Sequence, residues 1–237
     1  MKRCLGAACI LLFFCPDGNA QRFRAPENRQ NHYRERWQFG FSPGANRMNF
    51  VLKFADRFVR LDSLKSVLSQ PETGLQLHML AERRLHAYLT LRFEPGFQLG
   101  QRELDYHFAT PSKNYTVTQK IESNLVNFPV LLRLRSKRLV NFAAYMGAGG
   151  FYAYDVASQR DVNTSLAGQQ IVRLQRWDYG ALSEGGVDFF FPYVKMSLGL
   201  RMSFGLPNLL APDGTIYSRA LKSLRSQSMY FCLFLEG

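Results

Sequence analysis

The chain has 237 residues, a formal net charge of +12 and 46% hydrophobic residues, which is enough for one large domain or two small ones with a buried core. An aromatic content of 14% argues against a disordered chain. No apolar run reaches the roughly 18 residues that a membrane-spanning helix needs, which excludes a helical membrane protein. A soluble β-rich domain and an outer-membrane barrel both stay open.

The first twenty residues have the pattern of a secretory signal peptide. Lys2 and Arg3 give a positive start, residues 4–15 are largely apolar, and the stretch ends on the small residue Ala20. Cleavage after Ala20 lowers Lys+Arg from 30 to 28 and Asp+Glu from 18 to 17, a net charge of +11. Cys232 is then the one cysteine left, so no intramolecular disulfide can form. For an exported basic chain we expect anionic lipid headgroups or acidic proteins as partners, and not nucleic acid.

The mature chain divides into a polar arm and a domain with a period of two. Residues 21–35 are polar without an apolar period, and we predict a periplasmic arm there. Residues 36–237 alternate instead. In residues 194–206, for example, every even position is apolar and every odd position is polar or glycine. Thirteen residues exceed the usual five or six of a globular strand and suit a tilted membrane strand of about nine to eleven.

Eight segments follow this pattern, and the connections between them alternate in length. The segments are 37–52, 74–83, 86–103, 120–135, 139–156, 173–189, 193–206 and 226–236. The short connections are 84–85, 136–138 and 190–192, and the long ones are 53–73, 104–119, 157–172 and 207–225. Short periplasmic turns alternating with longer external loops are typical of outer-membrane barrels. The sequence therefore predicts an all-β, eight-stranded antiparallel transmembrane β-barrel with both termini in the periplasm. The alternative is a soluble exported barrel of the lipocalin type.

Charged residues inside the predicted strands set the expected direction of the side chains. An Arg or Lys on the lipid face costs about 2–4 kcal/mol near the membrane midplane, so we expect the charged face to line the lumen. Charges in a low dielectric are costly unless they are paired, which predicts a network of mixed sign. We interpret this network as structural, with a proton or ligand path as the alternative. Its predicted members are Arg92, Glu94, Arg133, Glu184, Asp188, Lys195 and Arg201.

Other features carry smaller predictions. Aromatic residues near strand ends are expected to form interfacial girdles, namely Trp37, Tyr88, Trp177, Phe190, Phe191 and Tyr193. The four histidines (His32, His78, His86, His107) form no metal-spaced pair, so we expect no metal, no cofactor and no enzymatic activity. A pairing of His86 or His107 with Ser112 or Ser123 is the catalytic alternative.

The leucine spacing in residues 60–68 permits one or two helical turns. Arg219, Lys222 and Arg225 form either a solvated basic face or a contact for lipopolysaccharide or a partner.

Four stretches resemble the PorT family of small outer-membrane β-barrels, which is associated with the type IX secretion system. The longest of them reads YLTLRFEPGFQLGQREL at 88–104, and the others lie at 37–50, 122–138 and 188–210. The resemblance implies a non-enzymatic accessory or assembly role in protein secretion, with other secretion-system proteins as partners. The alternative is a generic small outer-membrane barrel with a structural, adhesion or lipid-binding role, in contact with outer-membrane lipid and lipopolysaccharide. The chain ends on Gly237, whereas many outer-membrane barrels end on an aromatic residue.

Overall fold

The computed structural model describes residue 28 and residues 35–55, 64–110, 113–157, 174–211 and 220–237. These residues form nine strands: β1 (Trp37–Phe54), β2 (Leu64–Arg84), β3 (Leu89–Phe93), β4 (Gly96–Thr110), β5 (Lys113–Arg135), β6 (Phe142–Asp155), β7 (Trp177–Phe190), β8 (Lys195–Gly205) and β9 (Leu221–Glu236). None of the described residues belongs to a helix long and apolar enough to cross a membrane. The predicted signal peptide (1–20) and most of the predicted arm (21–35) lie outside the described residues.

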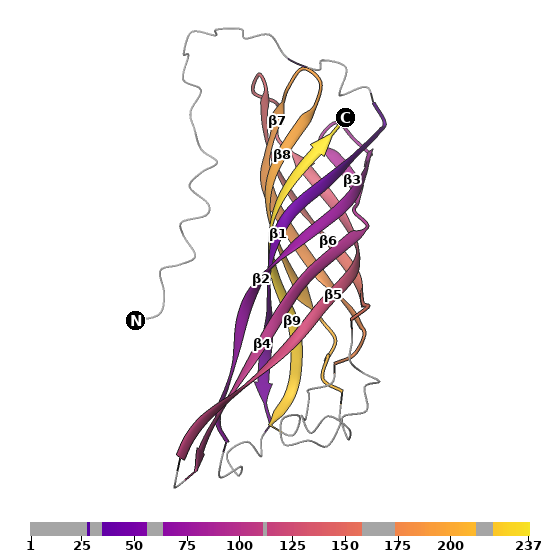
Figure 1. Cartoon of the computed structure of the whole chain (residues 1–237). Coiled ribbons are helices and arrows are strands. Elements are labelled where there is room, and N and C mark those ends of the chain that lie inside the picture. Colours follow the sequence, from indigo (N-terminus) through magenta and orange to yellow (C-terminus); the bar gives the residue numbers. More distant parts are fainter. Residues whose placement is uncertain (1–27, 29–34, 56–63, 111–112, 158–173, 212–219) are drawn as a thin grey trace, which may run out of the picture.

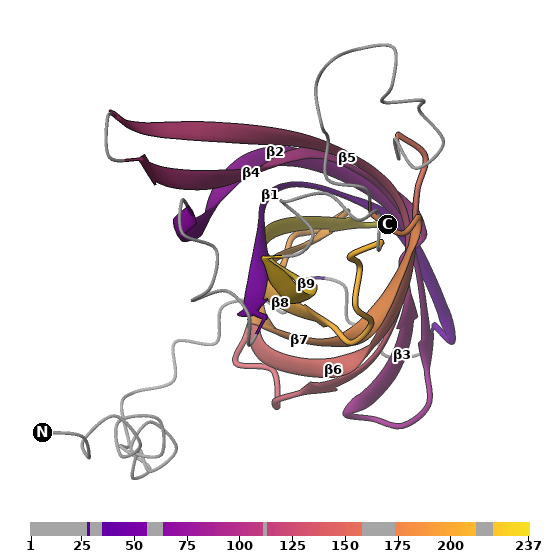
Figure 2. The same cartoon turned by 90° about the horizontal axis from the view of Figure 1, so that it is seen from below.

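The strands close into a ring (Figures 1 and 2). Each strand pairs antiparallel with its neighbour in the chain, and β1 also pairs with β9. Strands β3 and β4 are two pieces of one strand, because both pair with β2 on one side and with β5 on the other. The break between them falls at Glu94 and Pro95, where proline lacks the N–H that a ladder needs. The predicted all-β fold with eight strands around the ring is therefore confirmed.

The two ends of the barrel differ in their connections. Short segments join β2 to β3, β5 to β6 and β7 to β8 at the end where the C-terminus lies, which we name the turn end (Figure 1). The β4–β5 hairpin projects from the opposite end, which we name the hairpin end. The predicted long connection over 104–119 is wrong, because Thr110 pairs with Lys113 across a gap of two residues. The predicted helical turns at 60–68 are also wrong from Leu64 onward, where β2 begins; residues 60–63 lie outside the described residues.

These extra strand residues escaped the pattern because their two faces exchange character. On β4, the outward-facing residues are apolar up to Leu99 and polar from Gln101 to His107. The inward-facing residues are polar or glycine up to Arg102 and apolar from Leu104 to Phe108. A rule that looks for apolar residues on the outward face therefore stops at Leu99, although the strand continues for another eleven residues to Thr110.

The same exchange on β5 marks the edge of an apolar outer band. Outward-facing residues of β5 are polar up to Asn124 and apolar from Val126 to Leu134. Nine residues extend about 26 Å along a strand, or about 20 Å along the barrel axis at a tilt of ~40°. That height is close to the roughly 25 Å lipid-facing band of outer-membrane barrels. Beyond it, residues 64–73 of β2, 101–110 of β4 and 113–124 of β5 form what we name the outer sheet, which leans away from the barrel opening (Figure 2).

The inner face of the outer sheet packs against the connections that lie over the hairpin end. Leu104, Tyr106 and Ile121 of the sheet join Leu174, which precedes β7, and Leu209 and Leu210, which follow β8, in one buried apolar cluster. Backbone hydrogen bonds hold the connections in place, because the Leu209 N–H donates to Leu224 O at 2.8 Å and the Gln175 N–H donates to Leu209 O at 2.8 Å. We name this cluster the apolar cap. Its members are Phe50, Leu64, Val67, Leu104, Tyr106, Phe108, Ile121, Leu174, Leu209, Leu210, Ala220, Leu221 and Leu224.

Candidate functional site

Ten charged side chains meet inside the barrel between its middle and the turn end. Five are cations and five are carboxylates, so their formal charges cancel. The structure brings together all seven residues that the sequence suggested for the lumen and adds Glu82, Arg135 and Glu236. We name this set the lumen network: Glu82, Arg92, Glu94, Arg133, Arg135, Glu184, Asp188, Lys195, Arg201 and Glu236, each at most 8% exposed.

Glu82 and Arg92 lie at the centre of the lumen network. Arg92 donates to Glu82 Oε2 from Nε at 2.8 Å and from Nη2 at 2.5 Å, and Nη2 also donates to Glu236 Oε1 at 2.7 Å. Glu82 accepts two further hydrogen bonds, from Arg133 Nη1 at 3.0 Å and from Arg135 Nη2 at 3.1 Å. One carboxylate on β2 thus binds three arginines from two other strands, β3 and β5, which ties β2, β3 and β5 together across the lumen.

The other carboxylates link the opposite wall to this centre. Arg201 Nη2 donates to Glu94 Oε2 at 2.5 Å, and Arg201 Nε donates to Glu184 Oε2 at 2.8 Å. Lys195 Nζ donates to Glu236 Oε2 at 2.7 Å. Since both oxygens of most of these carboxylates are engaged, the network satisfies the condition under which buried ion pairs are tolerated.

Small residues on the barrel wall give the large lumen side chains their room. The Arg133 guanidinium lies over the Tyr145 ring, 3.5 Å from its centroid. A Cβ on Gly147 would lie 3.1 Å from Arg133 Cγ, and a Cβ on Gly199 would lie 2.3 Å from the Tyr145 hydroxyl. Both glycines therefore keep space for these side chains, and Gly147 is one of the small residues that weaken the alternation in residues 142–155.

Three layers follow one another inside the barrel towards the hairpin end. Beyond the lumen network, uncharged polar residues mix with a buried apolar cluster of Leu131, Phe151, Ala153 and Leu182; for example, Gln76 Nε2 donates to Cys232 Sγ at 3.2 Å. Arg102 comes next and donates from Nε to Ser123 Oγ at 3.0 Å, with its guanidinium 4.3 Å from the centroid of the Phe50 ring. The apolar cap follows. The lumen is therefore filled by side chains along its length, as the small bore of an eight-stranded barrel requires.

Five of the six aromatic residues suggested as girdle members are exposed at the barrel rims. Trp37, Tyr88, Phe191 and Tyr193 lie near the turn end, and Trp177 begins β7 near the hairpin end. Phe190 does not belong with them. It is 2% exposed, and the Arg138 guanidinium lies 4.1 Å from its ring centroid, because position 190 falls on the inward-facing alternation of β7.

The histidines suggested for catalytic or metal roles lie apart from one another. His78 is buried in the lumen, whereas His86 lies in the β2–β3 turn. His107 lies on the outward face of β4, with Nδ1 2.8 Å from Thr116 Oγ1. Ser123 is bonded to Arg102, and both His32 and Ser112 lie outside the described residues. Within the described part of the chain, no group of three or more His, Cys, Asp or Glu side chains is arranged to hold a metal ion.

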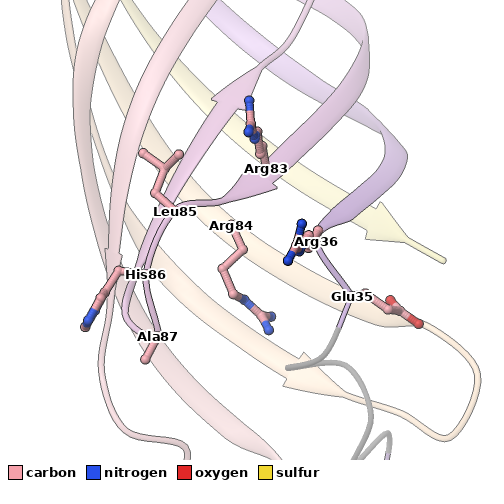
Figure 3. A pocket seen from close by; sticks show the side chains of 7 residues that line it. All are labelled: Glu35, Arg36, Arg83, Arg84, Leu85, His86 and Ala87. Atoms are coloured by element: carbon pink, nitrogen blue, oxygen red, sulfur yellow. The ribbon is translucent and has the colours of Figure 1, made fainter.

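An open cavity of about 540 Å³ lies at the turn end, where β1 begins and β2 ends (Figure 3). Glu35, Arg36 and residues 83–87 line it. The Arg84 N–H donates to Arg36 O at 3.0 Å and forms the last rung between the two strands. Neither the alternation nor the girdle pattern pointed to this cavity, because its side chains come from a turn and from the start of the barrel domain.

Three solved structures are similar to this chain at low sequence identity. The chain is similar in structure to the outer membrane protein OprG from Pseudomonas aeruginosa, with 12% identity and a TM-score of 0.46 over 85% of this chain and 91% of that one. It is also similar to Neisserial surface protein A, with 14% identity and a TM-score of 0.41 over 83% and 95% of the two chains. A third similar structure is Ail of Yersinia pestis in complex with the heparin analogue sucrose octasulfate, with 9% identity and a TM-score of 0.40 over 86% and 100%.

The family comparison is the one that assigns the chain. A search of curated proteins gives no match. A family model described as outer membrane protein beta-barrel domain matches residues 19–211, which is most of the chain. With its closed ring of strands and its apolar outer band, the chain thus belongs to the outer membrane protein β-barrel domain family and is a small barrel of the bacterial outer membrane.

Proposed function

We propose that this protein is a non-conducting, non-enzymatic anchor that holds the outer sheet at the cell surface, with its short turns and both termini in the periplasm. The observation that carries the proposal is the filled lumen. Ten charges that cancel are buried between the middle and the turn end, and the apolar cap covers the hairpin end. A barrel filled in this way is suited to hold a structure in place, and not to pass solutes.

The outer sheet supports the anchoring role. β5 pairs with β6 only from Leu125 onward, so the preceding half of β5 extends past the ring with β4 as its described neighbour. Its outward face is polar and carries cross-strand pairs, such as Lys120 with Glu103 at 3.1 Å and Thr118 with Asp105 at 2.6 Å. A projecting sheet with a soluble outer face and its own apolar core is a suitable element for contact with other proteins.

Basic residues beside the apolar band support a contact with lipopolysaccharide. Arg47 and Lys53 on β1 and Arg225 on β9 are exposed on the part of each strand towards the hairpin end, where the outward-facing Val51 lies between the two cations of β1. Cations near an anionic surface contribute about 1 kcal/mol each. Lys222 lies on the same strand as Arg225, whereas Arg219 is outside the described residues.

Planar-bilayer recording tests the sealed lumen. We expect the purified protein to show no stable large conductance, because its lumen side chains are buried and paired. A water-filled porin reconstituted in the same way serves as the positive control. A stable conductance comparable to that of the porin would overturn the proposal.

A second candidate function is an accessory or assembly role in type IX secretion. The four stretches that resemble the PorT family favour it, and a filled barrel is compatible with a component that does not itself conduct cargo. Deletion of the gene is expected to abolish export of secreted proteins while the envelope stays intact, measured by proteins in the culture medium and by detergent sensitivity. Normal secretion in the deletion strain would contradict a role in type IX secretion and would leave the anchor role unaffected.

A further inference from the structure

The cavity at the turn end gathers positive charge where the barrel meets the membrane surface. Arg36, Arg83, Arg84 and His86 line it together with one carboxylate, Glu35 (Figure 3). We propose that this cavity binds the phosphate group of an anionic phospholipid. Naming the periplasmic leaflet as its source rests on the orientation proposed above, whereas the binding site itself does not.

The chemistry of the lining residues suits a phosphate oxyanion. The guanidinium groups of Arg36 and Arg84 lie on the same side in Figure 3, whereas the Arg83 side chain points the other way. Each offers planar pairs of N–H donors, which match phosphate oxygens in a bidentate manner. The Arg84 N–H donates to Arg36 O at an N–O distance of 3.0 Å, which holds the backbones of these two residues together. The third, Arg83, is held by its own contact, since its guanidinium lies 5.4 Å from the centroid of the Trp37 ring. The backbones that carry Arg36 and Arg84 are thus fixed relative to each other before any ligand arrives.

The surroundings of the cavity favour a lipid over a free anion. Leu85, which lines the cavity, is 50% exposed, and Trp37, which the lining residue Arg83 contacts, is 53% exposed. The Trp37 ring stacks on Phe39 with centroids 6.3 Å apart, and Phe39 continues the apolar outward face of β1. A phosphate in the cavity therefore has an apolar track beside it, along which acyl chains can lie. A free phosphate ion would make no use of that track.

The position of the two tryptophans allows a direct test. The chain contains 2 Trp residues, Trp37 beside the cavity and Trp177 near the hairpin end. We take the full mature chain in vesicles and compare quenching by brominated phosphatidylglycerol with quenching by brominated phosphatidylcholine at equal mole fraction. In the Trp177→Phe variant, which keeps Trp37, we expect phosphatidylglycerol to be enriched about 25-fold over bulk, at roughly fivefold for each of the two cations Arg36 and Arg84. In the Trp37→Phe variant, the enrichment seen by Trp177 is expected to be smaller.

Charge variants identify the residues responsible. Arg36→Gln with Arg84→Gln in the Trp177→Phe background is expected to lower the enrichment about 25-fold, which abolishes it. Arg47→Gln with Arg225→Gln removes the same charge at the opposite end and leaves the Trp37 result unchanged. Heat-modifiable migration on a denaturing gel shows whether each variant is folded. If a charge variant does not fold, the comparison of the two single-tryptophan proteins still tests the proposal.

Three outcomes would overturn the proposal. The first is equal quenching of Trp37 by the two lipids. The second is an unchanged preference in the folded Arg36→Gln, Arg84→Gln protein. The third is a response of Trp37 to inorganic phosphate in phosphatidylcholine vesicles without any lipid preference, which would assign the site to a free anion. None of these results bears on conductance, so a failure here is distinguishable from a failure of the anchor role.

Discussion

Replacing Arg201 with methionine is expected to lower the free energy of unfolding by about 3–5 kcal/mol. The substitution keeps a similar side-chain volume and removes the cation that binds Glu94 at 2.5 Å and Glu184 through Nε at 2.8 Å. Both carboxylates are buried, so the change leaves the lumen network with one uncompensated negative charge. Urea unfolding in lipid vesicles, followed by the gel migration of folded and unfolded protein, measures the effect.

A neutralising partner substitution separates the charge effect from lost packing. In the Arg201→Met, Glu184→Gln protein the formal charges cancel again, so we expect at least about 1 kcal/mol of the loss to be recovered. The matched surface control is Lys120→Met, which breaks the 3.1 Å pair with Glu103 where Lys120 is 67% exposed. Exposed pairs contribute up to about 1 kcal/mol. Equal destabilisation by Arg201→Met and Lys120→Met would contradict a low-dielectric, fully engaged network.

The ring of strands could be predicted because lipid constrains one face of every strand. Within the apolar band, a residue facing lipid must be apolar and its neighbour can be polar, which imposes the period of two on residues 194–206 and on residues 89–99. The charged positions Arg92 and Arg133 then fix the inward direction by their cost on the lipid face. These constraints act on each strand separately, so a single sequence displays them.

The outer sheet could not be predicted in the same way because it lies in water. There the apolar residues, such as Leu104 and Tyr106, point inward and the polar ones point outward, which is the reverse of the membrane part. On β4 the alternation itself continues without interruption, and a search for the exchange of faces at Leu99 would have extended this strand. Its contacts with Leu174 and Leu209 come from distant connections, which no local pattern reveals.

Three of the ten members of the lumen network, Glu82, Arg135 and Glu236, were not predicted, for a related reason. Glu82 and Arg135 lie near strand ends, where the local sequence does not distinguish a turn residue from a strand residue. Glu236 is the penultimate residue of the chain. Each nevertheless falls two positions along its strand from another inward-facing residue: Leu80, Arg133 and Phe234. Alternation could have suggested them, whereas the choice of ion-pair partner depends on the ring geometry.

Arginine scanning along the outward face of β5 is expected to locate the edge of the membrane. Val130 is 44% exposed and occupies the middle of the apolar stretch from Val126 to Leu134. Val130→Arg is expected to lower the free energy of unfolding in lipid vesicles by about 2–4 kcal/mol, because the charge is placed near the midplane of the bilayer. Urea titration of folded protein in vesicles measures this difference.

The matched control is Thr118, which lies on the same strand and the same face as Val130, twelve residues earlier in the chain. Thr118 is exposed on the outer sheet opposite Asp105, so Thr118→Arg faces water and gains an opposite charge across the strand pair. We expect a change within about 0.5 kcal/mol. The expected change is small because Thr118 is surrounded by water both with and without a bilayer. A cost at Thr118 equal to that at Val130 would mean that the bilayer also covers the outer sheet, and the exchange of faces between Asn124 and Val126 would then not mark the membrane boundary.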